Sequence, residues 1–197
     1  MRDGKDSIPP PDWEAVSRSL DGHRRFIVTT HVNPDGDGLG AELGLWAYLK
    51  SLGKEVRILN PDPVPARYAF LAREAPFEVY DPAAHDAVID ANEVVIVLDI
   101  SRWERLDALG EKLRSSPALK LCIDHHPFEN TGMARHHLVD LTAAATGQLV
   151  YELIRRRGHE VDRRMALGFY VSILTDTGSF RFSNTDRRAH EAAGGVL

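Results

Sequence analysis

Short apolar runs recur along the chain, separated by polar loops and amphipathic stretches. Four of these runs are typical of buried strands and lie at residues 26–30, 56–59, 94–98 and 119–123. The run at 94–98 is apolar at every position, as expected for a parallel strand that is covered on both faces. A shorter apolar stretch at 137–139 predicts a strand at the edge of the same sheet.

Apolar residues at helical spacing predict helices between these strands. One such pattern ends before the stop signal Gly53 and is formed by Leu39, Leu43, Trp46 and Leu49. Further helices are expected to begin at the capping residues Asp12 and Thr146 and to cover residues 102–113 and 165–174. Strands alternating with helices indicate an α/β fold, with a Rossmann-like, mainly parallel sheet flanked by helices. In such sheets, ligand and metal sites lie at the carboxyl ends of the strands.

Length and charge narrow the class of protein. At 197 residues the chain has the length of one domain, or of one full domain plus the start of another, and its composition is that of a soluble globular protein. The formal net charge of −5 argues against a broad basic face that binds long duplex nucleic acid. A short anionic ligand remains compatible, because bound divalent metal ions reverse the local field.

Cysteine content and hydropathy exclude further classes. The single cysteine, Cys122, cannot form an internal disulfide or a cysteine cluster, and its apolar neighbours indicate a buried structural position. No apolar run approaches the ~20 residues needed to cross a membrane. Residues 1–11 form a polar leader without an apolar signal region, so the expected location is the cytoplasm.

Acidic and imidazole groups follow the predicted strands and one predicted helix. They fall in four segments, which contain His31, Asp35 and Asp37 in the glycine-rich loop 31–40, then Asp99, then Asp124-His125-His126, and last Asp176. Because the carboxyl ends of parallel strands meet at one edge of a sheet, we expect these groups to converge. Carboxylate and imidazole ligands without thiolate suit Mn²⁺ or another fairly hard divalent ion.

Each segment also has a simpler explanation. Asp35 and Asp37 are compatible with a solvated turn before a helix N-terminus, and Asp99 and Asp176 with helix capping. His125 and His126 are compatible with a surface turn. A second histidine pair, His136-His137, lacks a preceding aspartate and is interpreted as structural. The order of all four segments together favours the metal site.

In this order, the segments resemble the four motifs of the DHH phosphoesterase superfamily. The resemblance rests on His31-Val32-Asn33-Pro34-Asp35-Gly36-Asp37, Asp99, Asp124-His125-His126 and Thr175-Asp176-Thr177-Gly178, and spans roughly residues 15–195. The superfamily includes RecJ-type exonucleases, family II pyrophosphatases, cyclic-dinucleotide phosphodiesterases and oligoribonuclease/pAp phosphatases. Residues 124–127 and 175–182 are most similar to the oligoribonuclease/pAp phosphatase (NrnA-like) branch.

The resemblance implies two divalent metal ions, Mn²⁺ first and Mg²⁺ or Co²⁺ as alternatives. His31 and Asp35 would hold one ion; the second would be held by Asp37, His125 and Asp176, with Asp99 bridging the two. Such a pair supplies a nucleophile and polarises the phosphoryl oxygens.

The remaining groups of the site are assigned roles in catalysis and substrate contact. His126 would contact the phosphate or protonate the leaving group, and Asp124 would orient His125. Arg105 and Arg181 are the weaker candidates for contact with a substrate phosphate. A solvated surface position is the alternative for Arg105.

The implied activity is hydrolysis of phosphate esters in short oligoribonucleotides or 3′-phosphoadenosine 5′-phosphate (pAp). A cyclic-dinucleotide phosphodiesterase or an inorganic pyrophosphatase would use the same metal core. A silent metal- or nucleotide-binding remnant is the alternative of a different class. Residues 12–190 would form the catalytic domain and 191–197 the start of a helix towards a second domain, DHHA1, which is absent from this sequence. Dimerisation is left open.

Overall fold

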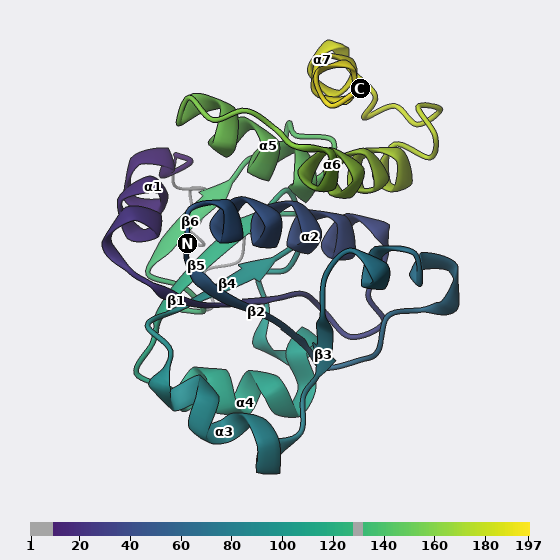
Figure 1. The fold of residues 1–197 in the computed structure, drawn as a ribbon. Coiled ribbons are helices and arrows are strands. Elements are labelled where there is room, and N and C mark those ends of the chain that lie inside the picture. Colours follow the sequence, from purple (N-terminus) through teal and green to yellow (C-terminus); the bar gives the residue numbers. More distant parts are fainter. Residues whose placement is uncertain (1–9, 128–131) are drawn as a thin grey trace, which may run out of the picture.

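The predicted apolar runs form one parallel sheet. Its strands are β1 (Arg25–Thr29), β2 (Glu55–Asn60), β3 (Phe77–Val79), β4 (Val94–Leu98), β5 (Leu119–Asp124) and β6 (His136–Val139). In this computed structural model, which describes residues 10–127 and 132–197, the strand order is β3-β2-β1-β4-β5-β6 and every neighbouring pair is parallel (Figure 1). The predicted α/β fold is therefore confirmed. The predicted leader, residues 1–11, lies outside the described residues except for its last two.

Helices cover both faces of the sheet (Figure 1). One face carries α1 (Trp13–Gly22), α2 (Gly36–Ser51), α5 (Thr146–Arg156) and α6 (Arg163–Asp176), and the other carries α3 (Pro82–Ala91) and α4 (Asp107–Ser115). Helix α7 (Arg187–Gly195) lies outside α5 and α6 and packs on both. Within the described part of the chain, none of the helices combines the length and apolar character that crossing a bilayer requires.

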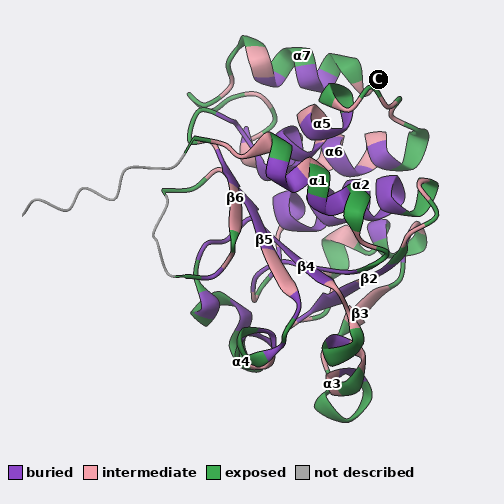
Figure 2. Ribbon diagram, turned by 90° about the vertical axis from the view of Figure 1, so that its left-hand side faces the viewer, coloured by how far each residue is buried: buried purple, intermediate pink, exposed green. Residues whose placement is uncertain are grey.

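Alternate residues of the central strands enter two separate cores. Val28 and Ile96 face the core under α2, whereas Ile27 and Val95 face the core under α3 and α4. All four are fully buried, and Figure 2 shows β4 and β5 as largely buried strands between the two layers. Burial of each such side chain contributes about 1.5–3 kcal/mol. Coverage on both faces explains why residues 94–98 have no polar position.

The backbones of α2 and α6 are in direct contact. A Cβ atom on Gly40 would lie 2.3 Å from the carbonyl oxygen of Gly168, so a side chain cannot be accommodated there. At the other end of the contact, a Cβ atom on Gly36 would lie 2.1 Å from the hydroxyl of Thr175. This packing places the first turn of α2 against the last turn of α6. The acidic residues of both turns are thereby brought together.

Three local predictions were wrong. The loop predicted at 31–40 ends earlier, because Asp35 accepts hydrogen bonds from the backbone N–H groups of Asp37 and Gly38 and caps α2 at Gly36. The helix predicted at 102–113 is two elements, a 3₁₀ helix (Trp103–Leu106) and α4, separated by the positive φ of 48° at Asp107. Thr146 is the first residue of α5 rather than its cap, and its hydroxyl donates to the carboxylate of Asp99 instead of capping the helix.

Candidate metal centre

The carboxyl ends of β1, β4 and β5 open into one cavity. β1 and β4 are neighbours in the sheet, but the chain leaves them in opposite directions, towards β2 and towards β5. Such a point leaves a crevice above the strand ends. A cavity of about 360 Å³ lies here, and its lining includes His31, Asp35, Asp99, Asp124, His126 and Asp176. The expected convergence of the four sequence segments is thus present.

A first group of possible ligands consists of His31, Asp35 and Asp99. The Nε2 atom of His31 lies 3.4 Å from Oδ2 of Asp99 and 3.9 Å from Oδ1 of Asp35. One ligand atom from each residue lies within 4.8 Å of the other two. Two atoms bound at ~2.1 Å to one ion lie about 3–4 Å apart, so this spacing fits a shared divalent ion.

A second group consists of Asp37, His125 and Asp176. The Nε2 atom of His125 lies 3.1 Å from Oδ2 of Asp176 and 3.3 Å from Oδ2 of Asp37. Asp176 is the last residue of α6, where the helix dipole disfavours a carboxylate. The capping explanation for Asp176 therefore fails, because a carboxylate cannot satisfy the free carbonyl groups at a helix C-terminus.

Asp99 is shared between the two groups. Its Oδ2 atom faces His31, while its Oδ1 atom lies 3.6 Å from Nε2 of His125. The residue is 4% exposed and has a φ of +66°, a conformation that is strained for a residue with a side chain. Burial, followed by the charges of Asp37 and Asp35, raises the pKa of Asp99 well above its usual range. Without a cation, the folded chain disfavours charge on this group.

The tautomer of His125 tests whether these residues fit a metal ion. Its Nδ1 atom lies 3.2 Å from the carbonyl oxygen of Ala143 and donates to it, which leaves the Nε2 atom facing three carboxylates. Within the described residues, Nε2 is buried and has no partner with hydrogen-bond geometry. Although burial lowers the pKa of His125, the carboxylates of Asp176 and Asp37 raise it to about 11. The three carboxylates therefore favour a positive charge next to Nε2 of His125. A divalent ion bound by Nε2 and these carboxylate oxygens would supply that charge.

Asp37 is held by the N-terminus of α5. Its carboxylate accepts hydrogen bonds from the backbone N–H groups of Thr146 at 2.7 Å and Gly147 at 3.0 Å, and from the hydroxyl of Ser172. Burial alone raises the pKa of Asp37, but the neighbouring imidazole of His125 and the hydrogen bonds from Ser172 and Thr146 lower it overall. The side chain of Asp37 is therefore fixed as a carboxylate although it is fully buried.

Three supporting residues were missed from the sequence. The hydroxyl of Thr146 donates to Oδ1 of Asp99 at 3.0 Å, the N–H of Gly147 bonds Asp37, and Ser172 bonds the same carboxylate. A Cβ atom on Gly147 would lie 2.2 Å from the hydroxyl of Ser172, so only glycine permits this approach. The available signals were a Thr-Gly pair after three alanines and a serine within an otherwise apolar helix.

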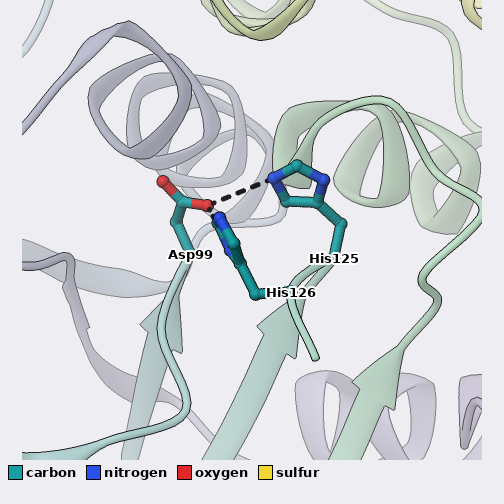
Figure 3. A group of neighbouring side chains, drawn as sticks. All are labelled: Asp99, His125 and His126. Atoms are coloured by element: carbon teal, nitrogen blue, oxygen red, sulfur yellow. Dashed lines mark ion pairs between the residues drawn. The ribbon is translucent and has the colours of Figure 1, made fainter. Parts of the chain in front are cut away.

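Asp124 contacts His126 rather than His125, contrary to the prediction. Its Oδ1 atom accepts a hydrogen bond from Nδ1 of His126 at 2.9 Å, and its other oxygen accepts from the hydroxyl of Ser101. Figure 3 shows both imidazoles beside the carboxylate of Asp99. The His126 atom nearest Asp99 is this same Nδ1, which Asp124 already occupies. The hydrogen bond to Asp124 raises the pKa of His126, which favours its protonated form.

The two predicted phosphate-binding arginines differ in position. Arg105 lines the cavity, and its Nη2 atom lies 2.9 Å from Nδ1 of His31. Arg181 donates to the carbonyl oxygen of Gly178 in its own turn and does not line the cavity. Arg102, which the sequence did not single out, lines the cavity beside Arg105.

Comparison with known proteins identifies the family. The DHH family, N-terminal domain, matches residues 25–173 of the chain. This span contains the first five of the six residues grouped above, from His31 to His125. The chain belongs to the DHH family.

Its curated relatives include oligoribonucleases. The chain is 35% identical over 194 residues to the bifunctional oligoribonuclease and PAP phosphatase NrnA of Thermus thermophilus, covering 95% of this chain and 55% of that protein. It is 28% identical over 186 residues to the NrnA of Bacillus subtilis, covering 91% and 55%. The chain thus spans about half the length of the relatives that it matches.

Solved structures share the fold. An exopolyphosphatase-related protein of Bacteroides fragilis matches with a TM-score of 0.89 and 26% identity, over 94% of this chain and 55% of that one. Exonuclease RecJ bound to manganese matches with a TM-score of 0.58 and 15% identity, over 96% and 48%. At that identity, the likeness to RecJ shows the fold alone.

Proposed function

We propose that this chain is a phosphoesterase that uses two divalent metal ions, Mn²⁺ first, to hydrolyse short oligoribonucleotides or pAp. The observation that carries the proposal is the position of Asp99, whose two oxygens face two different groups of ligands. Support also comes from the relatives, whose names describe an oligoribonuclease and PAP phosphatase. Residues 12–190 are proposed as the catalytic unit.

Six residues would hold the ions. One ion would be held by His31 and Asp35, and the other by Asp37, His125 and Asp176, with Asp99 shared. When bound, the ions supply a water nucleophile at neutral pH and neutralise charge on the phosphoryl oxygens. The hydrogen bonds from Thr146, Gly147 and Ser172 fix the orientation of the buried carboxylates before an ion arrives.

His126 is proposed as the general acid. Its Nδ1–H donates to Asp124, so the proton available for transfer is the one on Nε2. The side chain is 54% exposed and lines the cavity, where a leaving oxygen can reach it. Because Asp124 raises the pKa of His126, the imidazolium is populated nearer neutral pH than in a free histidine.

Arg105 is proposed as a phosphate ligand that binding of an ion releases. Nδ1 of His31 lies 2.9 Å from Arg105 and 2.8 Å from the carbonyl oxygen of Val32, and these partners demand opposite protonation of Nδ1. If Nε2 of His31 is engaged by an ion, Nδ1 carries the proton and donates to Val32. The guanidinium of Arg105 then loses its acceptor and becomes available to phosphate oxygens in the cavity.

A substrate panel tests the proposed function. The chain is incubated with Mn²⁺ and, separately, with pAp, a 5′-labelled diribonucleotide, cyclic di-AMP and pyrophosphate, beside the Asp99→Asn variant. Turnover of pAp or the dinucleotide above that variant is expected. Turnover of only cyclic di-AMP or pyrophosphate would replace the proposed substrate class. No turnover of any substrate would leave a silent binding module.

A further inference from the structure

Glu42 is a buried acid outside both groups of metal ligands. It lies on α2, five residues after Asp37, and is fully buried. Its Oε2 atom accepts a hydrogen bond from Nδ2 of Asn60 at 2.9 Å, and its Oε1 atom has no partner among the described residues. Burial raises the pKa of Glu42 well above its usual range, so the folded chain favours the neutral acid. Burying a hydrophobic side chain here would cost less desolvation free energy than burying a carboxyl group. The presence of a carboxyl group therefore requires an explanation.

The partner of Glu42 has a fixed orientation. Asn60 is the last residue of β2 and is 1% exposed. Its Oδ1 atom accepts a hydrogen bond from the backbone N–H of Thr30 at 3.0 Å, where the backbone ladder between β1 and β2 has ended. The Nδ2 group must then point towards α2, where it needs an acceptor. Glu42 supplies this acceptor.

Thr30 connects this pair to both ligand-bearing strand ends. It directly precedes His31, and its hydroxyl donates at 3.0 Å to the carbonyl oxygen of Leu98, which directly precedes Asp99. The first turn of α2 rests on the same side chain, because a Cβ atom on Gly38 would lie 2.3 Å from the hydroxyl of Thr30. Hydrogen bonds thus run from Glu42 through Asn60 and Thr30 to positions adjacent to two proposed ligands.

We propose that Glu42 is a positioning residue for the group His31, Asp35 and Asp99, acting through Asn60 and Thr30. The inference rests on the proposed function in one respect, since it assumes that this group binds a divalent ion. Glu42 does not touch the ion. It holds the ends of β1 and β4 at the separation at which the imidazole of His31 and the carboxylate of Asp99 can bind the same ion. A glutamine supplies the same acceptor and is expected to replace it.

Metal affinity without substrate separates positioning from stability. Mn²⁺ binding is measured by calorimetry and by electron paramagnetic resonance for wild type, Glu42→Met and Glu42→Gln, and the metal-free proteins are melted in parallel. Glu42→Met keeps the length of the side chain but removes the acceptor; it is expected to weaken one of two Mn²⁺ sites about 10–100-fold. Glu42→Gln is expected to bind both ions as wild type does. A merely structural role would change the melting temperature and leave the Mn²⁺ affinity unchanged.

Asn60→Ala provides the second test, including for the case in which Glu42→Met does not fold. If Glu42 acts through Asn60, Asn60→Ala weakens the same site, and adding Glu42→Met to it changes the affinity no further. The inference is overturned if Glu42→Met binds Mn²⁺ like wild type, if Glu42→Gln is as weak as Glu42→Met, or if the two effects add. Failure of wild type itself to bind two ions would instead reject the proposed function, and this inference with it.

Discussion

Thr146 contributes to the site through two different groups, which substitution can separate. Its backbone N–H bonds Asp37 and its hydroxyl bonds Asp99. Thr146→Val keeps the shape and the backbone bond but leaves Asp99 without its hydroxyl donor. We expect Mn²⁺ affinity to fall about 10–100-fold, as calorimetry without substrate would measure. Thr146→Ser retains the hydroxyl and serves as the control; a loss of affinity in Thr146→Ser as large as that in Thr146→Val would contradict the assigned role of the hydroxyl.

The protonation of His125 predicts that Mn²⁺ binding releases protons. In the metal-free protein its pKa is raised to about 11, so the imidazole is protonated at pH 7.5, whereas a metal ligand must be neutral. Apparent Mn²⁺ affinity should therefore rise with pH between about 7 and 10, up to about tenfold per unit for one proton. Calorimetry in two buffers of different ionisation enthalpy counts the protons. If Mn²⁺ binding released no protons at pH 7.5, the protonated state assigned to His125 would be wrong.

Helix α7 braces the turn that follows Asp176. Its alanines 192 and 193 are buried against Ala145 and Ile173, and the ring of His190 stacks on Phe180 at 5.3 Å. Arg188 ties the helix to Glu152 on α5 and to Asp140. Helix α7 therefore stabilises the positions of α5 and of the turn after α6.

Loss of Arg188 should loosen α7 without unfolding the sheet. Arg188→Met leaves Glu152 without its cation, and since both side chains are mostly buried we expect a local loss of about 1–3 kcal/mol. Hydrogen exchange should accelerate in α7 and at residues 177–182 and stay unchanged in β4. Arg187→Met is the matched control, because among the described residues Arg187 pairs only with Glu191, at the exposed surface of the same helix. Equal exchange in the two variants would refute the bracing role.

Elements with a strong apolar pattern were predictable, and weakly patterned ones were not. β4 and β5 are covered on both faces, so their sequences carry an unambiguous signal. β3 has three residues, none of them buried, and α3 buries only His85 and Ile89, so neither shows a readable period. The break before α4 depends on the positive φ of Asp107, which the sequence does not announce.

At the scale of the molecule, the convergence of the proposed ligands was predictable because parallel strands end at one edge. His31, Asp99 and His125 each follow a strand, and the strand order makes these ends neighbours. The residues that hold the ligands were not predictable in the same way. Asp37 is bonded by Thr146 and Ser172, which are 109 and 135 positions away. Such contacts arise from the packing of α2 on α5 and α6, and no local pattern encodes them.

The convergence of carboxylates predicts that, in the absence of metal ions, their mutual repulsion destabilises the fold. The pKa of Asp99 is raised first by burial and then by the charges of Asp37 and Asp35. The protonated carboxyl group therefore adds to the free energy of unfolding below about pH 4, and this contribution is lost as the pH rises and the group ionises. Asp99→Asn should therefore melt at a higher temperature than wild type without metal, and the difference should grow from pH 4 to neutral pH. With Mn²⁺ at about 100 times its Kd, wild type should gain about 2.7 kcal/mol and several degrees, and the variant much less. Glu111→Gln makes the same charge change on the exposed side of α4 and should alter neither melting curve. A metal-free Asp99→Asn that melts below wild type would show that Asp99 stabilises the fold through its hydrogen bonds more than its charge destabilises it.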